Sequence, residues 1–236
     1  MANLFTKSQF RHELKFLITN SEAEILRRRL TTFMRLDPHT DLTGNYRVRS
    51  LYFDDLNFSA YRDKMDGVPS RQKFRIRIYN STSNRITLER KIKEDSFVQK
   101  QSAPLTRSQV EMLQSGNYSF LLKTPHPLHK IFYFEVVSRV LRPTLIVEYE
   151  REPYLYEYGD VRVTFDRNVR AVLAREDIFS TNLPTALVLE PGKLILEVKY
   201  TQFFPSMIRD LLPTHGVEFV ALSKYVSCFD KTVYKR

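Results

Sequence analysis

The sequence predicts an α+β protein whose strands form a closed or nearly closed eight-stranded antiparallel β-barrel with flanking helices. Strand-like segments rich in β-branched and aromatic residues recur along the chain, between a few helical segments. In most of them apolar and charged side chains alternate, as in a strand with two different faces. The 236 residues, 42% of them hydrophobic, are enough to bury a substantial core.

The strands are expected from turn residues that bound each alternating run. Their approximate ranges are 11–18, 46–53, 73–80, 85–93, 143–151, 160–166, 193–199 and 217–222. The chain contains no low-complexity stretch, no repeat of fixed period and no Gly/Ser linker. We therefore expect a single domain over residues 1–236.

Helices are expected at four places. Ser21 and Glu24 have the spacing of a capping box, which predicts a helix over 21–34. Thr106 and Gln109 have the same spacing and predict a short helix that stops near residue 116. The segments 128–141 and 205–212 are predicted as further helices.

The net charge predicts a polyanionic partner. Lys and Arg number 37 and Asp and Glu 27, so the formal net charge is +10. The densest basic run is Arg27–Arg29, shorter than the basic tails that bind nucleic acid. We therefore expect no specific nucleic-acid site, and we interpret this triplet as a solvated helix face that leaves a peripheral contact with an anionic membrane open.

The sequence also predicts a cytoplasmic protein. No apolar run approaches the roughly 20 residues of a membrane-spanning helix, and residues 1–10 lack the apolar core of a secretory signal. Cys228 is the single cysteine, which excludes an internal disulfide framework.

The alternation places charge on one face of several strands. In residues 73–79, Phe74 and Ile76 share one face, and Arg75 and Arg77 share the other. Four further strands repeat the pattern, with Glu13 and Lys15, with Glu89, Lys91 and Lys93, with Arg162 and Asp166, and with Glu197 and Lys199 on their charged faces.

Such a face has two interpretations. It can be the solvated side of an ordinary antiparallel sheet. Alternatively, if the sheet closes, it lines a lumen, and the apolar face packs outward against the helices. The repetition in five strands, with mainly basic residues and a minority of carboxylates, favours a lumen suited to a phosphate chain.

Six short motifs, in their order along the chain, resemble a known family. They are Arg11–Phe16 (RHELKF), Ser50–Asp54 (SLYFD), Phe74–Arg77 (FRIR), Leu88–Lys91 (LERK), Leu196–Lys199 (LEVK) and Leu222–Tyr225 (LSKY). The sequence resembles, over roughly residues 8–230, the VTC domain, the polyphosphate polymerase domain of the vacuolar transporter chaperone complex and its stand-alone bacterial relatives. That family belongs to the CYTH-like triphosphate tunnel metalloenzymes, whose eight-stranded barrel encloses a basic tunnel.

The resemblance implies roles for individual side chains. It implies phosphate-gripping residues that act in catalysis, at Lys15, Arg75, Arg77, Lys91, Arg162 and Lys224. It implies further substrate or phosphate contacts from Lys93, Tyr149, Arg151, Lys199 and Ser223. It implies a divalent metal, Mn²⁺ or Mg²⁺, held by Glu197. Glu13 and Glu89 are weaker metal candidates, and a plain ion pair is the alternative for each.

The first motif departs from the hydrolase and cyclase branch of the same superfamily. That branch begins with Glu-x-Glu-x-Lys, whereas Arg11 precedes Glu13 and Lys15 here. Loss of one carboxylate should weaken a second metal and the water it activates. The expected function is therefore transfer of the γ-phosphoryl of ATP onto polyphosphate. The alternatives are a metal-dependent triphosphate or nucleoside triphosphate hydrolase and a non-catalytic polyphosphate-binding module.

Overall fold

The computed structural model describes residues 12–95, 97–201, 203–212 and 223–233. Its strands are β1 (His12–Thr19), β2 (Arg35–Leu36), β3 (Tyr46–Asp54), β4 (Ser70–Tyr79), β5 (Thr87–Glu94), β6 (Phe97–Pro104), β7 (Arg142–Tyr156), β8 (Val161–Leu173), β9 (Ala186–Leu187) and β10 (Lys193–Tyr200). They form one ten-stranded sheet in the order β1-β10-β8-β7-β3-β4-β5-β6, with β2 paired to β7 and β9 to β8. Neighbouring strands pair in antiparallel orientation.

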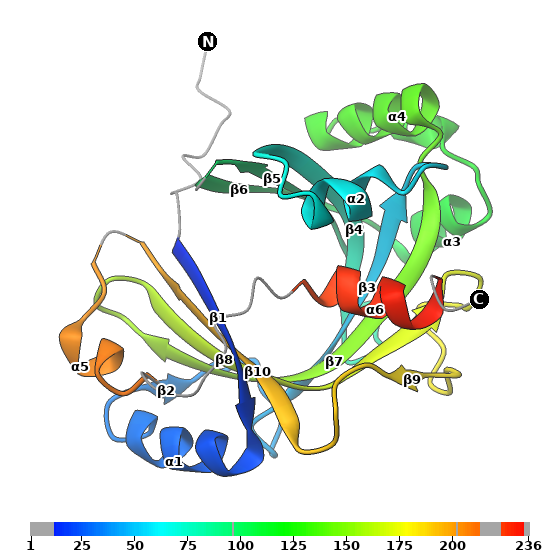
Figure 1. Cartoon of the computed structure of the whole chain (residues 1–236). Coiled ribbons are helices and arrows are strands. Elements are labelled where there is room, and N and C mark those ends of the chain that lie inside the picture. The colour runs from blue at the N-terminus through cyan, green and yellow to red at the C-terminus, as the bar shows by residue number, and fades with distance from the viewer. Residues whose placement is uncertain (1–11, 96, 202, 213–222, 234–236) are drawn as a thin grey trace.

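The helices are α1 (Asn20–Leu30), α2 (Ser59–Met65), α3 (Arg107–Gln114), the 3₁₀ helix η1 (Ser119–Lys123), α4 (Pro127–Arg139), α5 (Ser206–Arg209) and α6 (Lys224–Thr232). Figure 1 shows the sheet curling into a deep trough, with α1, α3, α4 and α5 outside it and α6 on its concave side. Within the described ranges, no helix combines the length and the apolar character needed to cross a membrane.

The two edges of the trough face each other without backbone pairing. Strands β1 and β6 end the described sheet and are not hydrogen-bonded to one another. A side chain bridges the gap instead, because Lys91 Nζ on β5 lies 2.9 Å from Glu13 Oε2 on β1. The expectation of a nearly closed antiparallel barrel is confirmed. Its eighth main strand is β6, which the sequence analysis missed, while the strand expected at 217–222 lies outside the described residues.

The apolar sides of the strands face outward. Phe74 and Ile76 of β4 pack in one buried cluster with Val110 of α3 and Phe132 of α4. On the other side of the trough, Leu196 of β10 joins Leu26 and Leu30 of α1 in a second cluster. Burial of these faces against helices leaves the opposite, charged face of the sheet inside the trough.

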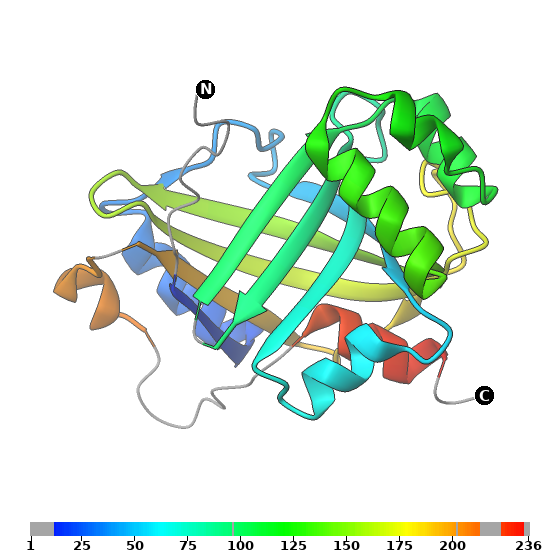
Figure 2. The same ribbon diagram turned by 90° about the horizontal axis from the view of Figure 1, so that it is seen from above.

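The concave face itself is apolar at one end. There α6 covers it, and Tyr225 and Phe229 pack with Leu145, Val169 and Ile195. This arrangement fills one end of the lumen with α6 (Figures 1 and 2) and leaves the remaining lumen to the charged residues.

The first helix begins one residue earlier than the sequence predicted and ends at Leu30 instead of residue 34. Thr19 is its N-cap: the Thr19 hydroxyl accepts from the backbone N–H of Glu22, and the Glu22 carboxylate accepts from the N–H of Thr19 at 2.7 Å. The proposed Ser21–Glu24 box is therefore wrong, because Glu24 pairs with Arg27 and Arg28 on the helix surface. The box formed by Thr106 and Gln109 is confirmed at α3.

Candidate functional site

The strand register places the predicted strand residues on one face. Residues directly opposite each other in an antiparallel pair project to the same side of the sheet. The pairs Glu13–Lys199, Lys15–Glu197, Lys199–Arg162, Asp166–Arg151, Arg151–Tyr46, Tyr52–Arg75, Arg75–Glu89 and Lys73–Lys91 link β1, β10, β8, β7, β3, β4 and β5 in this way. This face is the concave one, opposite the apolar clusters.

Two carboxylates on β1 and β10 form the centre of the charged lumen. Glu13 and Glu197 are diagonal neighbours on β1 and β10, and each carboxylate affects the pKa of the other. Glu13 lies 2.9 Å from Lys91 Nζ and 3.7 Å from Lys15 Nζ, and Glu197 lies 2.8 Å from Lys199 Nζ. Burial by itself would raise the pKa of Glu197, but Lys199, Lys224 and Lys15 hold it well below its ordinary value. The lysines thus keep the pair anionic in a buried setting.

A second group lies where α6 enters the lumen. Arg151 grips Asp166 with two hydrogen bonds of 2.6 and 2.7 Å and reaches Glu197 at 3.2 Å. Lys224, the first residue of α6, lies 2.6 Å from Asp166 Oδ2. The Tyr149 ring lies beside both cations, 5.1 Å from the Arg151 guanidinium carbon and 4.9 Å from Lys224 Nζ. The sequence placed Asp166 on the charged face without giving it a role; here it orients Arg151 and Lys224.

The Arg75–Arg77 pair of β4 is oriented by a third carboxylate. Glu89 lies 2.6 Å from Arg75 Nη2, 3.9 Å from Arg77 Nη1 and 3.1 Å from Lys100 Nζ. Burial would raise the pKa of Glu89, but these three cations lower it far below its ordinary value. The ion-pair interpretation accounts for the position of Glu89, so its weaker candidacy as a metal ligand stays a prediction.

Neutral donors and acceptors hold the same two arginines. Arg75 Nη1 donates to the Tyr52 hydroxyl at 2.8 Å. Arg77 donates to Ser50 Oγ at 3.2 Å and to the Tyr149 hydroxyl at 3.3 Å. Such contacts fix planar guanidinium groups in advance of a ligand.

Three predicted residues make other contacts. Arg162 lies opposite Lys199 in the β8–β10 ladder, and Asp37 Oδ2 and the Tyr46 hydroxyl accept from its guanidinium at 2.8 and 2.7 Å. Lys93 is half-exposed, opposite Arg71 in the β4–β5 ladder. Ser223 is buried at the N-cap of α6, and its side chain makes no capping hydrogen bond.

Sequence reasoning missed two further lysines of the lumen. Lys73 has the same strand phase as Arg75, and its ammonium lies 5.8 Å from the Tyr52 ring centroid. Burial, together with neighbouring Lys91 and Lys15, holds its pKa well below the ordinary value. Lys100 lies opposite Lys91 on β6. The alternation in 73–79 already contained the signal for Lys73, whereas Lys100 lies on a strand that was not predicted.

The donor set fits one divalent cation only when substrate completes it. In the described residues no group of three or more His, Cys, Asp or Glu side chains could hold a metal ion. Glu13 and Glu197 supply two adjacent carboxylates, and Mg²⁺ is commonly held by one or two carboxylates together with substrate phosphates and water. The pair therefore fits a metal shared with a phosphate chain.

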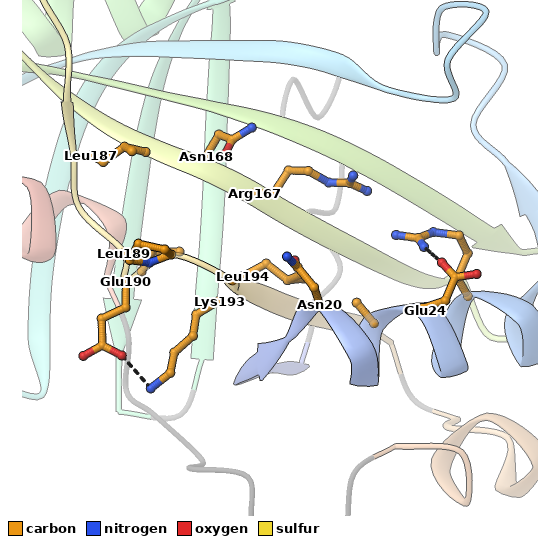
Figure 3. Close-up of a pocket in the computed structure, with 13 residues that line it drawn as sticks. Asn20, Glu24, Arg167, Asn168, Leu187, Leu189, Glu190, Lys193 and Leu194 are labelled. Atoms are coloured by element: carbon orange, nitrogen blue, oxygen red, sulfur yellow. Dashed lines mark hydrogen bonds and ion pairs between the residues drawn. The ribbon is translucent and has the colours of Figure 1, made fainter.

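A separate pocket of about 570 Å³ lies outside the barrel, between α1 and strands β8 and β10 (Figure 3). Its two arginines, Arg27 and Arg167, both pair with the buried Glu152 beneath them, Arg27 at 2.7 Å. Arg27 is therefore part of a structural ion pair, and the interpretation of the whole triplet as a solvated face is wrong at this residue. The membrane contact remains a prediction.

Comparison of structures relates the fold to known proteins. The Hippeastrum protein HpAC1, named as an adenylyl cyclase and described as having a dominant triphosphatase activity, is 15% identical with a TM-score of 0.54, and the match covers 95% of this chain and 97% of that one. A Bacillus halodurans protein named as an adenylate cyclase is 12% identical with a TM-score of 0.48, covering 87% and 95%. No curated protein matches the sequence. The likeness to HpAC1 supports the fold.

A family match at the level of sequence also covers nearly the whole chain. The VTC domain matches residues 10–233, from just before β1 to the end of α6, and so includes the strands and the helix that supply the charged lumen. Because the VTC domain matches nearly the whole chain, including every strand of the barrel, the chain belongs to the VTC domain family.

Proposed function

We propose that the lumen binds a linear phosphate chain and transfers the γ-phosphoryl of ATP onto polyphosphate with a divalent metal, Mn²⁺ or Mg²⁺. The observation that carries this proposal is the convergence of basic side chains from β1, β4, β5, β7, β10 and α6 on one concave face around the Glu13–Glu197 pair. The VTC family supports it, and the triphosphatase activity described for HpAC1 supports a substrate with linked phosphates.

Phosphoryl transfer asks the protein mainly for positioning and charge neutralisation. Arg75, Arg77 and Arg151 would each offer a planar fork to phosphate oxygens. Lys91 and Lys224 would add point charges along the chain. Because Glu89 and Asp166 already hold these arginines, little side-chain freedom is lost when phosphate binds.

The reaction itself would be a displacement at one phosphorus atom. A terminal oxygen of the polyphosphate chain attacks the γ-phosphorus, the anhydride bond between the β- and γ-phosphates breaks, and ADP leaves with that electron pair. Glu13 and Glu197 would hold the metal, which when bound neutralises phosphate charge. Cations on both sides of the reacting phosphoryl group would stabilise the charge that moves to ADP.

Hydrolysis is the second candidate, and a specific observation favours it. Glu13 is present on the lumen face beside Glu197, and HpAC1 is described as a triphosphatase. Against it stands Arg11, which occupies the place of the first carboxylate in the hydrolase motif; this residue lies outside the described ranges. A binding module without catalysis is the third candidate.

One experiment separates the three. The purified protein is incubated with ATP and Mn²⁺, and the phosphate products are sized by gel electrophoresis. Long chains are expected; orthophosphate alone would establish the hydrolase, and unchanged ATP would leave a binding module. Arg75→Ala should abolish product formation, whereas Lys193→Ala, which removes a cation paired with Glu190 outside the lumen, should not. We further propose a cytoplasmic location, where ATP is available.

A further inference from the structure

Helix α4 carries apolar side chains on its outer side as well as on its inner side. On the inner side Leu128, Phe132 and Val136 are buried against the outside of the sheet. On the outer side Phe134 and Val137 are 63% and 60% exposed. Figure 1 shows this helix at the outer rim of the molecule. A helix that is hydrophobic all round is normally covered on every side, so in the described part of the chain the outer side of α4 lacks a cover.

The exposed side chains of α4 follow one stripe along the helix. Residues three or four positions apart are neighbours on a helix surface. Lys130, Phe134, Val137 and Val140 have these spacings and are all exposed, and we call them the α4 stripe. Leu122 of η1, which packs against α4, is 43% exposed as well. The outer side of this helix is therefore a continuous apolar surface with one lysine in it.

The end of the helix retains an apolar residue in an unfavourable conformation. Val140 caps α4 with φ 55° and ψ 44°, in the left-handed region. Glycine is the usual residue at such a position, and a β-branched side chain is strained there. The Val140 side chain is also 55% exposed, so its contacts within this chain offset little of the strain. An apolar surroundings outside the chain would give this valine a role.

The charges around the stripe are of one sign. Lys130 lies within it, Lys123 precedes α4 on η1, and Arg142 follows the helix. All three are exposed, and within the described ranges none of them forms an ion pair. The acidic residue of α4, Glu135, is half-buried and lies 3.7 Å from Arg139. The helix therefore presents apolar side chains together with positive charge and no exposed carboxylate.

We propose that the α4 stripe is a docking surface for a membrane that contains anionic phospholipids. Phe134, Val137 and Val140 enter the boundary between headgroups and acyl chains, and the neighbouring cations meet lipid phosphates. The aliphatic stem of Lys130 lies along the apolar surface while its ammonium stays at the headgroups. A bilayer is favoured over a folded protein because it accepts side chains that protrude from a convex helix without a matching groove. The proposal goes beyond the proposed function and does not depend on it.

The test measures binding to vesicles by cosedimentation. The vesicles contain phosphatidylcholine alone, or equal parts of phosphatidylcholine and phosphatidylglycerol. The unmodified protein is compared with Phe134→Ser/Val137→Ser, which removes apolar side chains of the stripe, and with Lys123→Gln/Lys130→Gln, which removes cations. Melting temperatures confirm that each variant is folded.

A matched control removes the same kinds of side chain from another helix. In Ile25→Ser/Arg28→Gln the changed residues lie on α1, where Ile25 is 52% exposed and Arg28 belongs to the basic triplet. A further variant, Val140→Gly, separates docking from folding. Glycine relieves the strain at this position, so the melting temperature should stay equal or rise while vesicle binding weakens. A purely structural role for Val140 would leave vesicle binding unchanged.

The unmodified protein should bind the anionic vesicles at least about tenfold more tightly than the neutral ones, and added salt should weaken this binding. Each α4 double variant should lose about tenfold or more in affinity for the anionic vesicles. The α1 control should stay within about twofold of the unmodified protein.

Four results would overturn the inference. The first is that the unmodified protein does not bind anionic vesicles, and the second is that the α4 variants bind them normally. The third is an equal loss in the α1 control, which would assign the contact to the basic triplet or to general attraction by a basic protein. The fourth is an oligomer, seen by light scattering, that Phe134→Ser/Val137→Ser dissociates, because a second copy would then cover the stripe.

Tripolyphosphate binding, measured by calorimetry in parallel, keeps this inference separate from the proposed function. The α4 variants should bind tripolyphosphate as the unmodified protein does, because the stripe lies outside the lumen. An unmodified protein that binds anionic vesicles but no tripolyphosphate would refute the proposed function alone. Normal tripolyphosphate binding with any of the four results above refutes the docking surface alone.

Discussion

Two buried charged networks lie on opposite faces of the same sheet, and they differ in balance. On the outer face Arg49 pairs with Glu148 at 2.5 Å and donates to the carbonyl oxygens of Ile178 and Ser180. On the inner face Asp166 and Glu197 are surrounded by Arg151, Lys224 and Lys199. In both networks the carboxylates are buried and paired with cations.

In the outer network three protein oxygens, from Glu148, Ile178 and Ser180, accept from the buried Arg49. In the inner network the cations outnumber the carboxylates and line a solvent-facing trough. Charged groups that are buried and balanced hold a fold together, whereas a surplus of one sign indicates that a ligand supplies the rest. The following predictions separate these two roles.

The largest effect is expected in the outer network. Arg49→Met should destabilise the protein by about 3–5 kcal/mol, because Glu148 would remain buried with only Arg170 as a charged partner. Urea unfolding measures this loss. Arg49→Met/Glu148→Leu should recover part of it, and a single variant as stable as the unmodified protein would contradict the structural role.

In the inner network the effect should appear in binding. Arg75→Ala should weaken tripolyphosphate binding by about 10- to 150-fold, the equivalent of one charge-assisted contact of roughly 1.5–3 kcal/mol. Stability should change less, since Arg77 and Lys100 still neutralise Glu89. Calorimetry with Lys193→Ala as the control measures the affinity. If Arg75→Ala binds normally but unfolds easily, the inner network is structural too.

The Glu13–Glu197 pair should behave unlike the arginines. Glu197→Gln removes a negative charge from a basic lumen, so metal-free tripolyphosphate should bind at least as tightly as before. Metal-dependent turnover should fall about tenfold or more, as expected when metal affinity is lost. Calorimetry with and without Mn²⁺, together with product sizing, measures both. Normal metal-dependent turnover by this variant would refute the metal assignment.

The smallest effect concerns pH. Burial lowers the pKa of Lys91 from 10.5 to about 8, although Glu13 opposes the shift. Lys91 is therefore charged below about pH 8 and loses its charge above it, so metal-free tripolyphosphate affinity should fall up to about tenfold between pH 7 and pH 9. Because the folded-state pKa is lowered, this group should disfavour folding most below pH 8 and less as pH rises toward 10.5. Lys91→Arg keeps its charge and should show a flat binding profile; a slope equal to that of the unmodified protein would exclude Lys91 as its cause.

The fold was predictable because the alternation had a period of two in strand after strand. That period decides which side chains share a face, whatever the strand order, so Arg75, Lys91 and Glu197 could be grouped before their pairing was known. The concave face carries them together, as expected.

What remained unpredictable depends on three-dimensional packing. The segment of β6, 97–104, has no clean alternation, and it is a strand because β5 offers it an edge. At the start of helix α2 the carboxylates of Asp54 and Asp55 accept from the N–H groups of Ala60 and Ser59, respectively. The spacing of these residues is not that of a capping box, so the sequence did not predict this helix. The role of Asp166 likewise follows from α6, which brings Lys224 to it.

The pairing of β1 with β10 has a consequence for how the protein is made. Glu13 precedes its partner Lys199 by 186 residues along the chain (199 − 13) and is therefore synthesised well before it. At about 5–20 residues per second, β1 waits roughly 10–40 s for the strand that completes it. During that interval Lys15 and Glu13 have no partner strand, and the charged lumen has no second wall. The nascent chain therefore cannot bind a phosphate chain in the mature way until β10 has emerged.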